Sequence, residues 1–158
     1  MTDIIRNDPL VASNFWLEIE GATISMLSEV SGLDLEIEVV ETKQASQNGQ
    51  WVGFKAPGQP KLAGELTIKR LAPIDIDSDE VWKWFKTIRD KGMGIKDRGG
   101  QRKNGSVVVY DATNAEIARW NFFNSWPSKI SNDSFTAGSA EAVSETVTLV
   151  IEKLERKK

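Results

Sequence analysis

One amphipathic helix stands in a sequence whose other segments read as strands, and this contrast constrains the fold more than any other feature. The segment 78–91 begins at Ser78, a residue type that favours helix N-caps, and Gly92 follows it. Its apolar residues recur at helical spacing and form one stripe, which comprises Val81, Trp84, Phe85 and Ile88. Because a lone helix of this length is marginal in water, we expect it to lie on the strands.

The remaining apolar segments alternate with polar residues, as strands with one buried face do. The segments with this pattern are 14–20, 23–30, 33–41, 62–71, 106–112, 115–124 and 143–154. Short turns join them, among them the turn Asp111-Ala112-Thr113-Asn114, so the pairing is expected to be antiparallel. We predict a mainly β fold, either a small antiparallel β-barrel or a two-sheet sandwich, flanked by one helix.

The length of 158 residues suits a single domain spanning 1–158, with residues 1–12 as an extended N-terminal arm. The chain has no cysteine and no histidine, which excludes disulfides, thiolate chemistry and the commonest general base. Its net charge of −3 does not favour nucleic-acid binding by the whole chain. Without an apolar run of membrane-spanning length or a signal pattern, we expect no membrane insertion and assembly in the cytoplasm.

The predicted strand 33–41 has two contrasting faces. Its apolar face comprises Leu33, Leu35, Ile37 and Val39, which we expect to point inward. The opposite face carries the acidic row Asp34, Glu36 and Glu38. Such a row is most often a solvated surface, and the alternative is that it lines a polar channel.

The segment 42–61 is predicted to be a long loop, since it contains Asn48-Gly49, Gly53, Pro57-Gly58 and Pro60. A loop of this length inside a compact domain is usually functional. It also carries apolar residues, Trp51, Val52 and Phe54, followed by Lys55. Two interpretations remain open for them: they return to the core of their own chain, or they contact another subunit.

Patterns typical of catalysis or ligand binding are weak in this sequence. Gly92-Met93-Gly94 follows a helix, whereas a nucleotide-binding loop follows a strand, so we interpret it as a helix end. The carboxylates of Glu36 and Glu38 share one strand face, which is a common surface pattern rather than a catalytic pair across a cleft. The basic set Lys96, Arg98, Arg102 and Lys103 lacks interleaved aromatics and reads as a solvated loop. We predict no enzyme activity, metal or cofactor.

A family resemblance appears in the segment Ala118–Lys129. Its residues Arg119, Trp120, Asn121, Phe122, Trp126, Pro127 and Lys129 resemble a late-strand pattern of the inner tube proteins of contractile phage tails and extracellular contractile injection systems. Further blocks agree in the same order: Asp8-Pro9-Leu10 with Asn14-Phe15, Ser28–Leu33, Leu66–Arg70, Asp79–Trp84, Arg102–Val107 and Glu145–Leu149. The block Leu66–Arg70 departs from the family pattern at the next residue, Leu71, where a glycine is usual.

The resemblance implies a fold similar to the haemolysin-coregulated protein of type VI secretion, a small β-barrel with a flanking helix. It also implies a role as a structural subunit that forms hexameric rings, which stack into a hollow tube. The implied partners are further copies of the chain, a sheath protein, a baseplate or tube-initiator paralogue and a tube terminator. A payload of protein or DNA would pass through the lumen.

Within this interpretation, we expect the segment 42–61 to form ring-to-ring contacts through Trp51, Val52, Phe54 and Lys55. We also expect the acidic row to face the lumen, with Lys83, Lys86, Arg98, Arg102 and Lys103 turned outward. The alternative function is a monomeric binding module for a sugar or a small apolar ligand, with Trp16, Trp51 and Trp126 as contacts.

Overall fold

The computed structural model describes residues 14–61, 64–92, 101–134, 136–138, 140 and 142–158. The predicted N-terminal arm and the central part of the basic loop, with Lys96 and Arg98, lie outside these residues. The described strands are β1 (Asn14–Ile19), β2 (Ala22–Leu27), β3 (Glu29–Ser31), β4 (Ile37–Ala45), β5 (Trp51–Pro60), β6 (Glu65–Leu71), β7 (Lys103–Tyr110), β8 (Glu116–Asn132), β9 (Ser144–Val150) and β10 (Lys153–Arg156). The helix that the structure describes between β6 and β7 is α2 (Glu80–Lys91).

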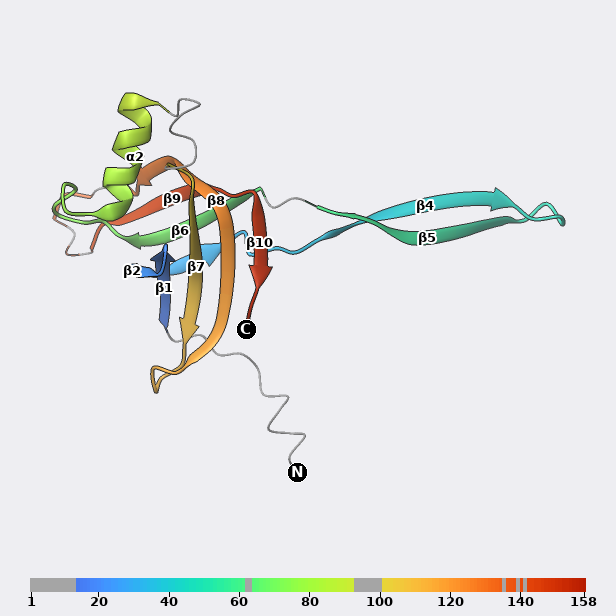
Figure 1. The fold of residues 1–158 in the computed structure, drawn as a ribbon, viewed down its shortest axis with the longest axis horizontal. Coiled ribbons are helices and arrows are strands. Elements are labelled where there is room, and N and C mark those ends of the chain that lie inside the picture. The colour runs from blue at the N-terminus through green and yellow to red at the C-terminus, as the bar shows by residue number, and fades with distance from the viewer. Residues whose placement is uncertain (1–13, 62–63, 93–100, 135, 139, 141) are drawn as a thin grey trace.

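The body of the molecule is one curled antiparallel sheet in the order β2-β1-β7-β8-β9-β6-β3, with β10 paired to β8. The two end strands of this path, β2 and β3, are separated in the chain only by Ser28, whose backbone N–H donates to the carbonyl of Lys69 at 2.8 Å. The sheet therefore curls over to form two layers (Figure 1). The predicted mainly antiparallel β fold is confirmed, in its two-layer form rather than as a closed barrel.

The long strand β8 joins the two layers. Its first part pairs with β7 and β10, and from Trp126 onward it pairs with β9. The register shifts between Pro127 and Lys129, because proline cannot donate a ladder hydrogen bond. Pro127 is buried, and the shift beside it forms a bulge where β8 passes from one layer to the other.

The core lies between the layers and is formed by inward-facing residues of both. Its fully enclosed members are Leu17, Leu66, Ile68, Val107, Phe122, Val147 and Leu149. At one end of the body, α2 packs Val81 and Trp84 against this core, while Phe85 and Ile88 are half-buried (Figure 1). The indole N–H of Trp84 donates to the carbonyl of Gln101 at 2.7 Å, so the buried ring has no unpaired donor.

The predicted helix is confirmed, with a different first turn. It begins at Glu80, and its N-cap is Asp79 rather than Ser78. A carboxylate oxygen of Asp79 accepts from the backbone N–H of Trp82 at 3.0 Å, whereas the hydroxyl of Ser78 donates to the carbonyl of Asp75. Gly92 ends the helix at a φ of 70°, as predicted.

Two predictions for the segment 33–61 are wrong. The strand begins at Ile37 rather than Leu33, and its apolar face is not inward, since Ile37 and Val39 are more than half exposed. The segment 42–61 is not a loop, because most of it pairs with β4 as strand β5. Together, β4 and β5 form a two-stranded hairpin that projects away from the body (Figure 1).

Candidate functional site

The β4–β5 hairpin is regular from Val39 to its turn. The paired residues run from Val39 opposite Pro57 to Ala45 opposite Trp51, with Thr42 opposite Phe54 in the middle. The turn is closed by a hydrogen bond from the N–H of Gly49 to the carbonyl of Ser46 at 3.0 Å. Gly49 has a φ of 77°, which explains why Asn48-Gly49 stands at this point of the sequence.

The hairpin exposes large apolar side chains. Trp51 is 74% exposed, Phe54 58% and Val52 42%, and Lys55 beside them is exposed as well. Among the described residues, neither strand of the hairpin pairs with a strand of the body. The alternative in which these residues return to their own core is therefore excluded, and their contact with another subunit remains a prediction.

The acidic residues lie at the base of the hairpin. Asp34 and Glu36 precede β4 and only Glu38 lies in it, so they do not form a row on one strand as predicted. All three are exposed. The carboxylate of Glu36, just before β4, is 2.7 Å from the ammonium of Lys61, just after β5. This exposed pair joins the two chain segments at the base of the hairpin and partly neutralises the acidic residues there.

Those of the predicted basic residues that the structure describes have partners. Lys83 lies near Glu80, Lys86 near Asp77, and the guanidinium of Arg102 is 2.6 Å from Glu152. The ammonium of Lys103 lies over the ring of Trp84, 5.5 Å from its centre. These interactions divide the predicted basic set among separate partners, so the described part of it forms no continuous cationic surface.

The signature strand is a structural element. Phe122 is fully buried in the core, Trp126 packs against the core, and Asn121 accepts a hydrogen bond from Ser106 at 2.7 Å. Arg119 pairs with Glu18 at 2.8 Å and with Glu116. Lys129, the last residue of the pattern, is exposed.

Two glycines within the motif blocks are required by close packing. At Gly105, a Cβ atom would lie 2.5 Å from Cζ of Phe122, so only glycine lets β7 pass this ring. Gly32 has a φ of +92°, and a Cβ atom there would lie 2.3 Å from the carbonyl oxygen of Glu65. The motif residues therefore maintain the two-layer body that carries the hairpin.

A buried ionic network joins three of the motif blocks, and the sequence analysis did not connect its members. Arg70 on β6, only 2% exposed, donates to both carboxylate oxygens of Asp79 at 2.8 and 2.7 Å. Its Nε also donates to Glu145 on β9 at 2.9 Å. The indole N–H of Trp82 donates to the second oxygen of Glu145 at 3.2 Å, which fixes α2 to both strands.

The electrostatics of this network favour the ionised forms of Arg70 and Asp79. Burial acts to lower the pKa of Arg70, but its hydrogen bonds to Asp79 and Glu145 outweigh that effect and raise the pKa. Burial acts to raise the pKa of Asp79, and the hydrogen bonds from Arg70 and Trp82 outweigh it, so this pKa is lowered. The sequence signal for the network was the presence of charged residues in each of the three motif blocks.

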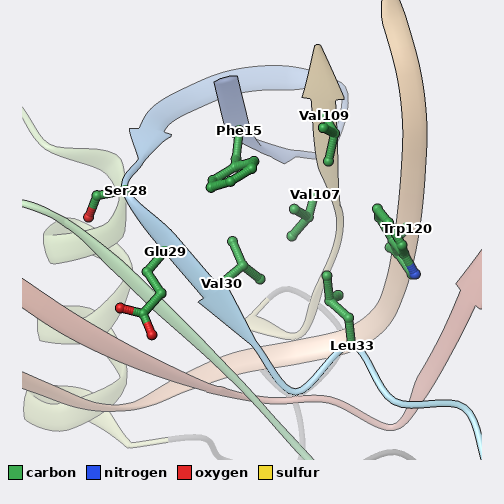
Figure 2. Close-up of a pocket in the computed structure, with 8 residues that line it drawn as sticks. All are labelled: Phe15, Ser28, Glu29, Val30, Leu33, Val107, Val109 and Trp120. Carbon is green, nitrogen blue, oxygen red and sulfur yellow. The ribbon is translucent and has the colours of Figure 1, made fainter. Parts of the chain in front are cut away.

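An apolar cavity of about 350 Å³ opens between the layers, next to the start of the hairpin segment. Phe15, Val30, Leu33, Val107 and Trp120 point into a common space, with Ser28 and Glu29 at one margin (Figure 2). The tryptophans proposed as ligand contacts do not meet there. Trp16 borders a different pocket, Trp51 lies on the hairpin, and Trp126 packs against the core.

The described residues contain no cluster of three or more acidic side chains that could hold a metal ion. Glu36 and Glu38, the carboxylates considered for catalysis, are exposed on the hairpin and its base. No helix in the described part of the chain combines the length and apolar character that a membrane span requires.

Comparison with known proteins agrees with the fold and the motif blocks. Residues 11–155 match the model of a family described as T4-like virus tail tube protein gp19. No curated protein matches this chain in sequence. The match covers nearly the whole chain, including both layers of the body and the hairpin.

Solved structures share the fold at low sequence identity. A chain of the sheath-tube complex of the PVC extracellular contractile injection system, in its extended state, superposes with a TM-score of 0.71 at 20% identity, covering 99% of this chain and 97% of that one. A chain from the anti-feeding prophage baseplate gives 0.71 at 15% identity, with coverages of 95% and 96%.

A more distant structure is Hcp1 from Flavobacterium johnsoniae, with a TM-score of 0.53 at 16% identity and coverages of 92% and 95%. These similarities concern the fold, and the family match carries the assignment. The chain belongs to the T4-like virus tail tube protein gp19 family and is a structural tail tube protein.

Proposed function

We propose that this chain is the repeating subunit of the hollow inner tube of a contractile injection particle or phage tail. Six copies form a ring, rings stack into a tube, and a protein or DNA payload passes through it. The observation that carries the proposal is the β4–β5 hairpin, which exposes Trp51 and Phe54 on strands that the body of the same chain does not cover.

Two-stranded hairpins are marginally stable in water unless a further element packs on them. The exposed apolar side chains of this hairpin therefore favour a partner, and in a tube the nearest partner is another copy of the chain. A contact between the hairpin of one copy and the body of another joins two different surfaces, so it is heterologous. Such contacts generate rings or helical stacks, which is the geometry that a tube requires.

In the proposed tube, the outer surface meets a sheath protein, and the ends meet a baseplate or tube-initiator paralogue and a terminator. The chain itself is assembled in the cytoplasm and enters no membrane. We propose no catalytic role, because a structural role accounts for the motif residues: Arg119, Asn121 and Phe122 all hold the body together.

Native mass spectrometry over a concentration series, combined with negative-stain microscopy, tests the proposal. We expect six-membered rings, and stacks of rings at higher concentration or after mixing with cognate tube components. A monomer at every concentration, with no larger species after mixing, contradicts the proposed function and leaves the monomeric binding module as the alternative.

The role of the hairpin is tested by the double variant Trp51→Ala with Phe54→Ala. Because both side chains are exposed in the subunit, the free energy of unfolding of the isolated chain should change by no more than about 1 kcal/mol. Ring stacking should fall at least tenfold, since a single buried aromatic at the centre of an interface can carry roughly 2 kcal/mol or more. Unfolding of the double variant as a monomer would contradict their assignment to the subunit contact.

A further inference from the structure

The two faces of the β4–β5 hairpin differ in charge. Side chains of a strand alternate between faces, and residues directly opposite each other in an antiparallel pair share a face. The register is continuous from Val39 to Ala45, since its only shift lies between Ile37 and Val39. Each described residue of this part can therefore be assigned to one face.

From Val40 to Gln44, one face carries no charge. This face comprises Val40, Thr42 and Gln44 on β4 and, opposite them, Ala56, Phe54 and Val52 on β5. Glu38 borders it at the base of the hairpin. The other face of the same part carries Glu41 opposite Lys55 and Lys43 opposite Gly53, between Val39 with Pro57 at the base and Ala45 with Trp51 at the tip. All of these residues are exposed in the isolated chain.

The alternation divides the residues that the sequence analysis treated as one group. Val52 and Phe54 lie on the uncharged face, whereas Trp51 and Lys55 lie on the charged face. Burying the charged face would remove the charges of Glu41, Lys43 and Lys55 from water, at a large cost in desolvation free energy. Burying the uncharged face removes only apolar surface and the polar groups of Thr42 and Gln44 from water, at a smaller cost. The uncharged face is therefore the one suited to burial.

We propose that the uncharged face of the hairpin is the surface that packs against a second copy of this chain, while the charged face stays hydrated. The inference rests on the proposed function, because it specifies how the hairpin makes the subunit contact. The strand β5 has ten residues and extends roughly 30 Å at about 3.3 Å per residue, so its tip lies beyond the reach of its own body. Figure 1 shows this projection.

A second copy is the occupant that the observations favour. From Val40 to Gln44 the face carries no charge, and Glu38 at its base is acidic, so it offers no cationic group to nucleic acid or an anionic membrane. A two-stranded sheet needs a covering layer for stability, and a repeating tube supplies one at every hairpin. The charged face then stays toward water, where Glu41 and Lys55 lie opposite each other without a desolvation cost.

The test transposes neighbouring residues, so that composition, net charge and length stay constant. In the double variant Thr42→Lys with Lys43→Thr, a lysine moves from the charged face to the uncharged face, opposite Phe54. The matched control, Glu41→Lys with Lys43→Glu, exchanges charges within the charged face. Circular dichroism and thermal unfolding of each chain confirm that the body is folded before assembly is measured.

We expect the first variant to raise the concentration needed for assembly by tenfold or more and the control to shift it by less than threefold. A second pair of variants repeats the comparison near the tip. Gln44→Lys adds a charge to the uncharged face and should weaken assembly, whereas Ala45→Lys adds one to the charged face and should be tolerated.

The outcomes separate the two proposals. If the unchanged chain does not assemble, the proposed function and this inference both fail. If it assembles and the transposition and its control weaken assembly equally, or neither weakens it, only the assignment of faces is overturned. A larger loss in the control also overturns it, because the charged face would then be the buried one.

Discussion

At the residue scale, Asp79 performs two tasks. It caps the N-terminus of α2 through the N–H of Trp82, and it accepts two hydrogen bonds from the buried guanidinium of Arg70. Since Glu145 takes the remaining Nε–H of Arg70, the helix, β6 and β9 meet at one ionic centre. Removing one partner leaves charge buried without compensation, which costs more than the loss of a surface pair.

The first prediction compares the true cap with the cap that the sequence suggested. Asp79→Ala should lower the free energy of unfolding by about 2–4 kcal/mol, because it removes both the cap and one partner of a buried pair. Ser78→Ala should change it by less than about 0.5 kcal/mol, since Ser78 is exposed. Chemical denaturation of both variants measures the difference, and equal losses would contradict the assigned cap.

The second prediction concerns acid stability. The pKa of Asp79 is lowered in the folded chain, so the unfolded chain binds a proton more readily. The contribution of Asp79 is therefore complete above its ordinary value of 3.8 and is lost as the pH falls below it toward the folded pKa. Asp79→Asn keeps an oxygen for the cap but not the charge, so the stability difference from the unchanged chain should shrink below pH 3.8. A difference that is constant with pH would contradict this assignment.

At the scale of elements, the molecule divides into a body that explains its own stability and a hairpin that does not. The body buries the apolar faces of both layers, with Leu17, Ile68 and Phe122 fully enclosed. The hairpin keeps Val39, Trp51 and Phe54 largely exposed. Its regular pairing supplies backbone hydrogen bonds but no covering layer, so its side chains contribute little to the folding of the single chain.

The third prediction separates the two parts. Replacing residues 38–59 by a short Asn-Gly turn, which keeps the pairing of Ile37 with Pro60, should change the unfolding free energy of the monomer by no more than about 1 kcal/mol. Ring stacking should be abolished. A loss of several kcal/mol in the monomer would show that the hairpin supports the body, and intact stacking would remove it from the interface.

At the scale of the whole molecule, the charge distribution bears on the proposed lumen. The acidic segment 34–38 is exposed at the base of the hairpin, and Lys61 offsets one of its carboxylates. An acidic lumen repels DNA weakly and lets it slide, whereas a basic lumen would hold it through phosphate contacts. The lumenal position of Asp34, Glu36 and Glu38 remains a prediction of the sequence.

The fourth prediction tests that position by charge reversal. In assembled particles, Glu36→Lys with Glu38→Lys should make payload release slower and more sensitive to salt. The control Glu65→Lys with Asp90→Lys makes the same change of net charge at exposed positions of the body. Unchanged release in the first variant would assign the acidic segment to a solvated outer surface.

The class of fold could be predicted from the sequence alone, because the spacing of apolar residues distinguishes a helix from a strand. Val81 and Trp84 at helical spacing, and Val147, Leu149 and Ile151 at alternate positions, are buried as predicted. The turn at Asp111 was also readable, since its side chain accepts from the N–H groups of Thr113 and Ala115. These features depend on residues that are close in the chain.

What covers each face of an alternating strand could not be predicted from the sequence, because it depends on packing between distant segments. The pattern of residues 33–41 predicted an inward apolar face, yet the same alternation in β4 belongs to a hairpin without a core beneath it. Periodicity shows that a segment has two faces, but it does not show what covers either one. Likewise, Arg70, Asp79 and Glu145 are distant in sequence, and only the pairing of β6 with β9 beside α2 brings their charges together.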